Sequence, residues 1–111
     1  MSCIILFCFV ACNADDDNPD DVNSVSAETG VYTFNNSATS VNLNVFYHRP
    51  ANYTNSTPIL FTFHGAGRNA KDYRDALINA AETYKFMVIA PEFSEQNFSG
   101  GDGYNLGNVY I

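Results

Sequence analysis

A histidine and two glycines stand between an apolar run and a helical pattern in FTFHGAGRNAKDYRD, residues 61–75. His64 is followed by Gly65, Ala66 and Gly67, so the chain has very little side chain at the end of a predicted strand. Glycine at such a point lets the backbone approach a ligand without a Cβ clash. The spacing therefore predicts a site where main-chain N–H groups meet either a phosphate or the oxyanion of an acyl-transfer reaction.

A phosphate site is the first possibility. Residues 65–70, GAGRNA, match the G-x-G-x-x-G/A fingerprint of dinucleotide-binding folds, after a predicted strand and before a predicted helix. Glu92, at the end of the next predicted strand, is near the spacing at which an acid binds the ribose. Against this, Pro91 stiffens that strand end, and His64 has no role in a phosphate loop. Dinucleotide binding through Gly65-Ala66-Gly67 is kept as the alternative.

An oxyanion site is the second possibility, and in it each residue has a task. Acyl transfer places negative charge on a carbonyl oxygen, which backbone N–H groups fixed in advance stabilise without reorganisation. A turn between a strand and a helix can present such a group, and glycines beside it let the backbone and a substrate approach without Cβ clashes. General-base catalysis by His64 would need a nucleophile within hydrogen-bond reach, so a structural role is favoured for this histidine.

Three blocks of sequence, HGAGRNAKDYRD, VIAPEFSEQNF and GYNLGNV, resemble α/β-hydrolase esterases related to the polyhydroxybutyrate-depolymerase and feruloyl-esterase group. The resemblance extends over residues 30–111. It implies a serine esterase whose substrate is a carboxylic ester, either a small molecule or one linked to a polysaccharide or polyester, with no cofactor and no metal. It also implies that the Ala66 N–H is one oxyanion donor, between Gly65 and Gly67, and that His64 fixes the turn by hydrogen bonds.

The nucleophile of such an esterase is a serine in a G-x-S-x-G motif on the following strand, and this motif does not occur here. Ser99, in FSGGDG, has glycines on one side only and is predicted to be a turn residue. His48 stands before Arg49 and Pro50 at a strand end, where a surface position is favoured over a triad role. We expect a chain that stops before the nucleophile strand: an N-terminal fragment, without the triad and inactive alone.

The surrounding elements predict an α/β fold with a mixed sheet, made of two N-terminal strands and then a β-α-β unit. Strands are expected at residues 31–34, 40–50, 59–65 and 86–93, and a helix between Asn69 as N-cap and Lys85 in the last turn. Parallel strands place HGAG and PEF at one edge of the sheet. The far side of the 59–65 strand is expected to be bare and apolar, since the nucleophile strand would pair there.

Alternation and helical spacing predict which residues are buried. In residues 40–50, one face is expected to be buried, and it contains Val41, Leu43, Val45 and Tyr47. Residues 59–65 are a nearly continuous apolar run, expected to be covered on both faces. The predicted helix has an apolar stripe at helical spacing, which consists of Tyr73, Ala76, Leu77, Ala80, Ala81 and Tyr84.

Charged and polar residues flank the glycine loop. An exposed charged face is expected at the start of the helix, formed by Arg68, Asp72, Arg74 and Asp75. The functional alternative is that Arg68 or Asp72 braces the loop. Candidates for the substrate cleft are Arg68 and, after the second parallel strand, Tyr104 and Asn105. Plain loop packing is an equal alternative for Tyr104 and Asn105.

The start of the chain differs from the rest. Residues 1–12 contain all the cysteines and a short apolar run that ends in FVAC, which resembles the lipobox of bacterial lipoproteins with Cys12 as the lipidated residue. Residues 13–30 are acidic and poor in large apolar side chains, as expected of a disordered tether. The hydrolase domain is then expected over residues 31–111.

The formal charge of −7 lies mainly in this leader, because residues 1–30 hold six acids and no Lys or Arg. A nearly neutral domain argues against nucleic acid as a partner. We expect an exported protein of the bacterial cell envelope or surface, which contacts the membrane only through a lipid anchor, or which is secreted if Cys12 is not lipidated. A non-catalytic surface module is a further alternative, although the absence of Trp makes a carbohydrate-binding platform less favourable.

Overall fold

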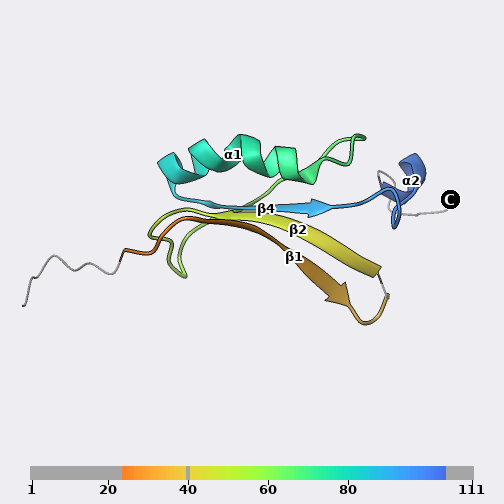
Figure 1. Ribbon diagram of the computed structural model, residues 1–111, viewed down its shortest axis with the longest axis horizontal. Coiled ribbons are helices and arrows are strands. Elements are labelled where there is room, and N and C mark those ends of the chain that lie inside the picture. Colours follow the sequence, from red (N-terminus) through yellow and green to blue (C-terminus); the bar gives the residue numbers. More distant parts are fainter. Residues whose placement is uncertain (1–23, 40, 105–111) are drawn as a thin grey trace, which may run out of the picture.

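The computed structural model describes residues 24–39 and 41–104 and shows a mixed sheet with one long helix on one side (Figure 1). Its elements are β1 (Glu28–Asn36), β2 (Val41–Arg49), β3 (Ile59–Phe61), α1 (Ala70–Tyr84), β4 (Met87–Glu92) and α2 (Gly100–Tyr104). The strand order is β1-β2-β4-β3; β2 is antiparallel to β1 and β4, and β3 is parallel to β4. The predicted α/β fold with a mixed sheet is confirmed.

β1 and β2 form a hairpin that is longer than predicted. β1 begins at Glu28 instead of Val31, and its register places Glu28 opposite Arg49. The Glu28 carboxylate accepts hydrogen bonds from Arg49 and from the Tyr47 hydroxyl, which hold this end of the strand. The acidic residue that looked like part of a tether is therefore paired with a cation on the neighbouring strand.

Burial alternates along β2 only from Val41 to Val45, and α1 covers the face that was not predicted to be buried. Phe46 and His48 face α1, and His48 is only 2% exposed. Val45, on the predicted face, is also buried, whereas Leu43 and Tyr47 are partly exposed. The crossover from β3 to β4 decides on which side α1 lies, and alternation within one strand does not indicate that side.

α1 contacts the sheet through a different set of residues from the predicted apolar stripe. Its buried residues are Ala70, Arg74 and Ala81, and of these only Ala81 belongs to the stripe. Tyr73 is exposed, and Tyr84 is 77% exposed. The N-terminal half of the stripe, without Tyr84, lines a hollow at the edge of the sheet, where the described chain provides no strand beyond β3. Small alanines let the helix approach the sheet closely.

Arg74 is buried beneath α1, so its predicted place on an exposed charged face is wrong. Its guanidinium donates hydrogen bonds to the carbonyl oxygens of Tyr47 at 2.9 Å and Gly30 at 3.1 Å. It also lies over the Phe46 ring and pairs with Asp75 at 2.6 Å. A buried charge needs such partners, and here they tie α1 to β1 and β2.

The ends of α1 lie close to their predicted positions but are stabilised differently. Asn69 is at the N-cap and makes no side-chain cap bond; its amide donates to Asp72 Oδ2 at 3.1 Å. Lys85 lies after the last turn, not within it. It adopts the left-handed conformation with φ of 56°, and its N–H donates to the Ala81 carbonyl oxygen. The helix therefore ends by a left-handed C-cap.

β3 is short and lies at the edge of the sheet. It ends at Phe61, although the Thr62 N–H still donates to the Ile89 carbonyl oxygen at 2.9 Å. Ile59, Phe61 and Phe63 are all exposed, so the prediction that this strand is covered on both faces is wrong. The prediction of a bare apolar edge is confirmed for residues 24–39 and 41–104, in which β3 pairs with β4 alone.

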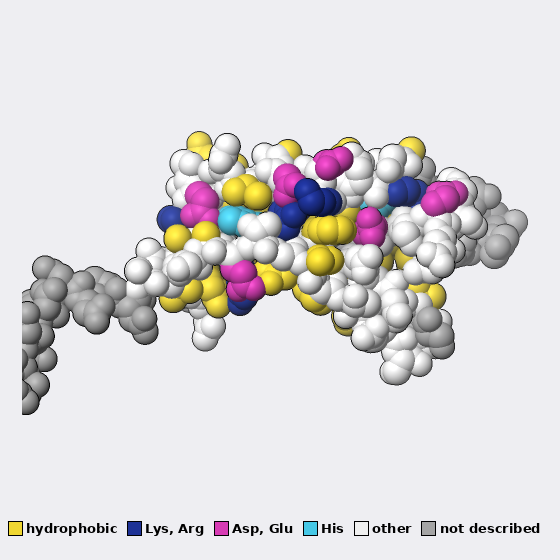
Figure 2. Space-filling model, in the orientation of Figure 1, with side chains coloured by type: hydrophobic (Ala, Val, Ile, Leu, Met, Phe, Trp, Pro, Cys, Tyr) yellow, Lys and Arg dark blue, Asp and Glu magenta, His cyan; other side chains and the backbone are white. Residues whose placement is uncertain are grey.

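The face of the sheet opposite α1 is apolar, and no described element covers it. Cross-strand partners such as Tyr32 with Val45, and Phe61 with Ile89, share this face. Figure 2 shows hydrophobic side chains along the lower side of the sheet, away from α1. An exposed apolar surface of this kind is typical of a face that packs against further polypeptide.

Candidate active site

The loops after β3 and β4 meet at one edge of the sheet, as predicted, because the two strands are parallel. A direct bond joins them: the Phe93 N–H donates to His64 Nε2 at 2.9 Å. α2 lies at the same end, beyond β4 (Figure 1). The predicted site residues His64, Ala66, Arg68 and Tyr104 are therefore brought together.

His64 is 2% exposed, and main-chain groups occupy both nitrogens of its ring. Nε2 accepts from Phe93, so the proton is on Nδ1, which donates to the Gly65 carbonyl oxygen at 2.8 Å. The Tyr104 ring stacks on the imidazole at a centroid distance of 4.6 Å. These contacts are those that a structural residue of the loop requires, and they leave no ring nitrogen for general-base catalysis.

Residues Gly65 to Arg68 form a turn that presents Ala66. The Arg68 N–H donates to the Gly65 carbonyl oxygen at 3.1 Å, which places Ala66 at the first central position of the turn. Ala66 is exposed, and its N–H has no hydrogen-bond partner within the described residues. It lies at the rim of a hollow of about 230 Å³, which is lined by Ala66, Arg68, Glu95, Gly100, Gly101 and Tyr104.

The two loop glycines are not required by the backbone conformation. Neither Gly65 nor Gly67 has a positive φ. A Cβ at Gly65 would meet the Tyr73 hydroxyl at 3.5 Å, an ordinary contact, and a Cβ at Gly67 would lie 3.3 Å from Asn69 Oδ1. At Gly65 the described protein would therefore accept a Cβ without a steric clash.

Arg68 and Tyr104, the predicted cleft residues, both line the hollow, and both are also bound within the protein. The Arg68 side chain is 12% exposed, so the predicted exposed position is wrong. Its guanidinium binds carbonyl oxygens of the segment after β4 and lies 4.6 Å from the Tyr104 ring centroid. The Tyr104 hydroxyl donates to the His64 carbonyl oxygen. Asn105 lies outside the described residues.

The remaining charged residues beside the loop are paired on α1. Asp72 accepts from the Asn69 amide and does not contact the hollow. The Lys71 ammonium donates to Asp75 at 2.7 Å, and this bond is the main cause that lowers the pKa of the Asp75 carboxyl. These contacts organise the start of the helix, and none of them presents a charge to the Ala66 N–H.

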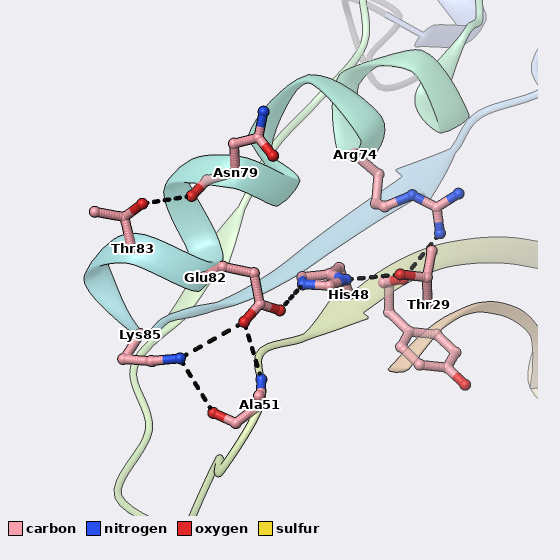
Figure 3. A network of polar contacts seen from close by, with 9 residues as sticks. Thr29, His48, Ala51, Arg74, Asn79, Glu82, Thr83 and Lys85 are labelled. Atoms are coloured by element: carbon pink, nitrogen blue, oxygen red, sulfur yellow. Dashed lines mark hydrogen bonds and ion pairs between the residues drawn. The ribbon is translucent and has the colours of Figure 1, made fainter. Parts of the chain in front are cut away.

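A second polar cluster, around His48, was not predicted (Figure 3). His48 is buried, so the predicted surface position is wrong; Nδ1 lies 2.7 Å from Thr29 Oγ1 and Nε2 lies 2.7 Å from Glu82 Oε1. The Ala51 N–H donates to Glu82 Oε2 at 3.2 Å and is the main cause that lowers the pKa of the Glu82 carboxyl. Because His48 pairs with Val88 near the start of β4, this cluster lies at the other end of the sheet from His64.

The described residues offer neither a metal site nor an activated serine. No cluster of His, Cys, Asp or Glu among them could hold a metal ion. Ser99 lies exposed just before α2, and its hydroxyl makes no hydrogen bond to either histidine in this part of the chain. The described part of the site therefore offers the Ala66 N–H as a hydrogen-bond donor and a loop that the contacts of His64 hold in place.

The dinucleotide alternative fits the geometry poorly. The Glu92 carboxylate, the predicted ribose ligand, accepts from the Asn44 amide at 3.0 Å. β4, which bears this acid, lies between β3 and the antiparallel β2, whereas a dinucleotide-binding unit continues with parallel strands.

Two of the solved structures that are similar to this chain are hydrolases. One is LpqC, a poly(3-hydroxybutyrate) depolymerase from Bordetella parapertussis, with 30% identity and a TM-score of 0.71, over 76% of this chain and 29% of that chain. The other is poly(aspartic acid) hydrolase-1 from Sphingomonas sp. KT-1, with 37% identity and a TM-score of 0.65, over 78% of this chain and 32% of that chain. No protein-family model and no curated protein matches the chain.

Both similar proteins are hydrolases of the α/β-hydrolase type, and this chain spans less than a third of the length of each. The four-stranded sheet and α1 therefore form a partial α/β-hydrolase fold. A dinucleotide-binding function is not favoured by these similarities.

Proposed function

We propose that this chain forms the N-terminal part of the hydrolase domain of a serine esterase, in which the Ala66 N–H is one donor of the oxyanion hole. The observation that carries the proposal is the turn from Gly65 to Arg68. It leaves the Ala66 N–H without a partner among the described residues, at the rim of the hollow where the parallel strands β3 and β4 end. Similarity to two hydrolases supports the proposal.

The proposed chemistry is stabilisation of charge that develops during acyl transfer. A nucleophile attacks the ester carbonyl carbon, and the carbonyl oxygen becomes negative in the tetrahedral intermediate, where an N–H donor at about 2.7–3.1 Å stabilises it. The bond from Phe93 to His64 and the bond from Arg68 to Gly65 fix the loop in advance. The proposal assigns the attacking serine to a part of the domain that the described residues do not include.

The proposed substrate is a carboxylic ester within or attached to a polymer. LpqC is a poly(3-hydroxybutyrate) depolymerase and the Sphingomonas protein is a poly(aspartic acid) hydrolase, so both act on polymers with ester or amide linkages. The ester is chosen because the HGAG, PEF and GYNLGNV blocks resemble esterases. No metal or cofactor enters this chemistry.

A segment exchange tests the proposal. Residues 28–104 replace the matched segment of LpqC, or, if that chimera does not fold, residues 64–69 replace the matched loop alone. The chimera is expected to hydrolyse p-nitrophenyl acetate. Ala66→Pro removes the N–H at a turn position that accepts proline and lowers kcat by about 10²–10³-fold, whereas Ala66→Gly keeps the N–H and the activity. A folded Ala66→Pro chimera with unchanged kcat would refute the proposal.

We also propose that residues 1–12 direct export and that Cys12 is lipidated, which would leave the domain at the cell surface. The support is the FVAC sequence and the acidic run that follows it. No helix in the described part of the chain is long and apolar enough to cross a membrane, and residues 1–23 lie outside that part. Incorporation of a radioactive fatty acid by the wild type but not by Cys12→Ser tests this; an unlabelled wild type would contradict it.

A further inference from the structure

We infer that Arg68 is the positioning residue of the proposed oxyanion loop. Its guanidinium ties the loop after β3 to the segment after β4, and this holds the Ala66 N–H at the rim of the hollow. The inference rests on the proposed function, because that function is what assigns the Ala66 N–H as an oxyanion donor. Arg68 acts through the turn that it closes and has no assigned contact with the reacting atoms.

The Arg68 guanidinium donates hydrogen bonds to three carbonyl oxygens of the short segment that follows β4. Nη1 donates to the Phe93 carbonyl oxygen at 2.6 Å, and Nη2 donates to those of Phe98 and Gly100, each at 2.9 Å. Nη2 also lies 3.1 Å from Glu95 Oε2, an exposed carboxylate. All these partners follow β4, whereas Arg68 follows β3. The side chain is therefore a direct link between the two strand ends that form the site.

A stack of rings completes the link. The Tyr104 ring contacts both the Arg68 guanidinium and the His64 imidazole, at 4.6 Å from Arg68 Cζ to the ring centroid and 4.6 Å between the ring centroids. The Tyr104 hydroxyl binds the His64 carbonyl oxygen, and His64 Nε2 binds the Phe93 N–H. Arg68 also binds the carbonyl oxygen of Phe93. The contacts form a closed circuit around the turn that presents Ala66.

The backbone of Arg68 adopts a conformation that is unfavourable for a residue with a Cβ. Its φ of 55° lies in the left-handed region, which a side chain of this size adopts only when other contacts compensate. Arg68 is also the last residue of the turn, because its N–H binds the Gly65 carbonyl oxygen. Losing the guanidinium contacts would remove the reason for this conformation and would release the turn.

Arginine is needed because its donors lie in a planar fork. Several carbonyl oxygens can be bound at once by that fork, whereas the ammonium group of lysine is a point charge on a flexible chain. Arg68→Lys therefore keeps the positive charge beside the hollow but loses the simultaneous contacts. A role through charge alone predicts that lysine restores function; positioning predicts that lysine behaves like Arg68→Met.

The first test uses the full chain and amide hydrogen exchange measured by NMR. In Arg68→Lys and Arg68→Met, exchange of the N–H of residue 68 and of Phe93 is expected to accelerate at least about tenfold relative to amides of the β2–β4 ladder. The control Lys71→Met changes an exposed cation on α1 and is expected to leave that ratio unchanged. Uniform acceleration of all amides, or no acceleration, would overturn the inference.

The second test separates this inference from the proposed function. In the chimera with LpqC, Arg68→Lys is expected to lower kcat by about tenfold or more with little change in KM, because misplacing a donor weakens transition-state stabilisation and not substrate binding. If Ala66→Pro lowers kcat by about 10²–10³-fold but Arg68→Lys matches wild type, the positioning role is wrong and the proposed function stands. If Ala66→Pro has no effect, the proposed function itself fails.

Discussion

Two buried histidines, one at each end of the sheet, are equally inaccessible but are bound in different ways. His48 and His64 are both 2% exposed. His48 lies between the side chains of Thr29 and Glu82, and so joins β1, β2 and α1 (Figure 3). His64 is bound by the main chain of Gly65 and Phe93, and so joins two loops.

The difference indicates what each end of the sheet does. Side-chain partners at His48 satisfy a polar group inside the packed strand–helix interface, which contributes to the stability of the fold. Main-chain partners at His64 fix the path of the loop that presents Ala66, where the neighbouring surface is hollow. Burial alone does not separate a fold-supporting histidine from a loop-shaping one; the identity of the bonded atoms does.

The largest expected effect comes from His48→Ala. The substitution leaves a cavity and removes one partner of the Glu82 carboxylate, so the free energy of unfolding is expected to fall by about 3 kcal/mol. Urea unfolding followed by circular dichroism measures this. Asn79→Ala, on the exposed side of α1, is the control and is expected to have little effect. If His48→Ala lowers the free energy of unfolding no more than Asn79→Ala does, His48 does not stabilise the fold as described.

A smaller global effect is expected from His64→Ala. The loss of bonds to two loops is expected to lower the free energy of unfolding by about 1–2 kcal/mol. The more informative measurement is local: the Phe93 N–H loses its acceptor and is expected to exchange faster than the amides of β2. If His64→Ala and His48→Ala both accelerate all amides alike, the contrast between the two ends is wrong.

Low pH is expected to affect the two ends of the sheet differently, because Glu82 contacts His48 and not His64. The pKa of Glu82 is lowered below its ordinary value of 4.5, first by the Ala51 N–H and then by the His48 hydrogen bond, with Lys85 adding to the effect. A carboxyl with a lower pKa in the folded state contributes stability above its unfolded pKa, and this contribution is lost as the pH falls through the folded pKa.

Glu82→Gln is therefore expected to reduce the loss of stability on acidification below pH 4.5. Urea midpoints of wild type and variant, measured from pH 6 downward, test this. Asp75 also has a lowered pKa, but it contributes equally to both proteins, so the difference isolates Glu82. Parallel pH profiles for the two proteins would show that the carboxylate does not interact in the folded state as described.

The smallest effect is expected from Lys71→Met. The Lys71–Asp75 pair is exposed on α1, so its loss should change the free energy of unfolding by less than about 0.5 kcal/mol. Thermal or urea unfolding measures this. A large destabilisation would mean that the start of α1, and not the His48 cluster, dominates the stability of the sheet–helix interface.

The sequence was sufficient for the architecture near the glycine loop. Apolar runs separated by a helical pattern predicted the β-α-β unit, and parallel strands placed HGAG and PEF at one edge. The β-α-β unit and the shared edge depend on local periodicity and on handedness, which are properties that one sequence shows. The bare edge of β3 had a different basis: it followed from the resemblance to α/β-hydrolases, in which the nucleophile strand would pair there.

The buried cations could not be predicted in the same way. Arg68 and Arg74 bind carbonyl oxygens of residues distant in sequence, and no pattern of side chains marks a main-chain acceptor. Arg and Lys are usually exposed, so the exposed face was the natural prediction. His48 was missed for a related reason: its partners Thr29 and Glu82 lie on two other elements, and only the tertiary fold brings them together.

The most direct test of the account measures by NMR how fast the Ala66 amide exchanges with solvent in the full chain, and compares this rate with those of the Arg68 and Phe93 amides. The account predicts that the Ala66 N–H exchanges nearly as fast as an unstructured amide, while the bonded N–H groups of Arg68 and Phe93 are protected at least about tenfold. An Ala66 amide as well protected as that of Phe93 would mean that the protein itself occupies this donor, and the proposed oxyanion role would be contradicted.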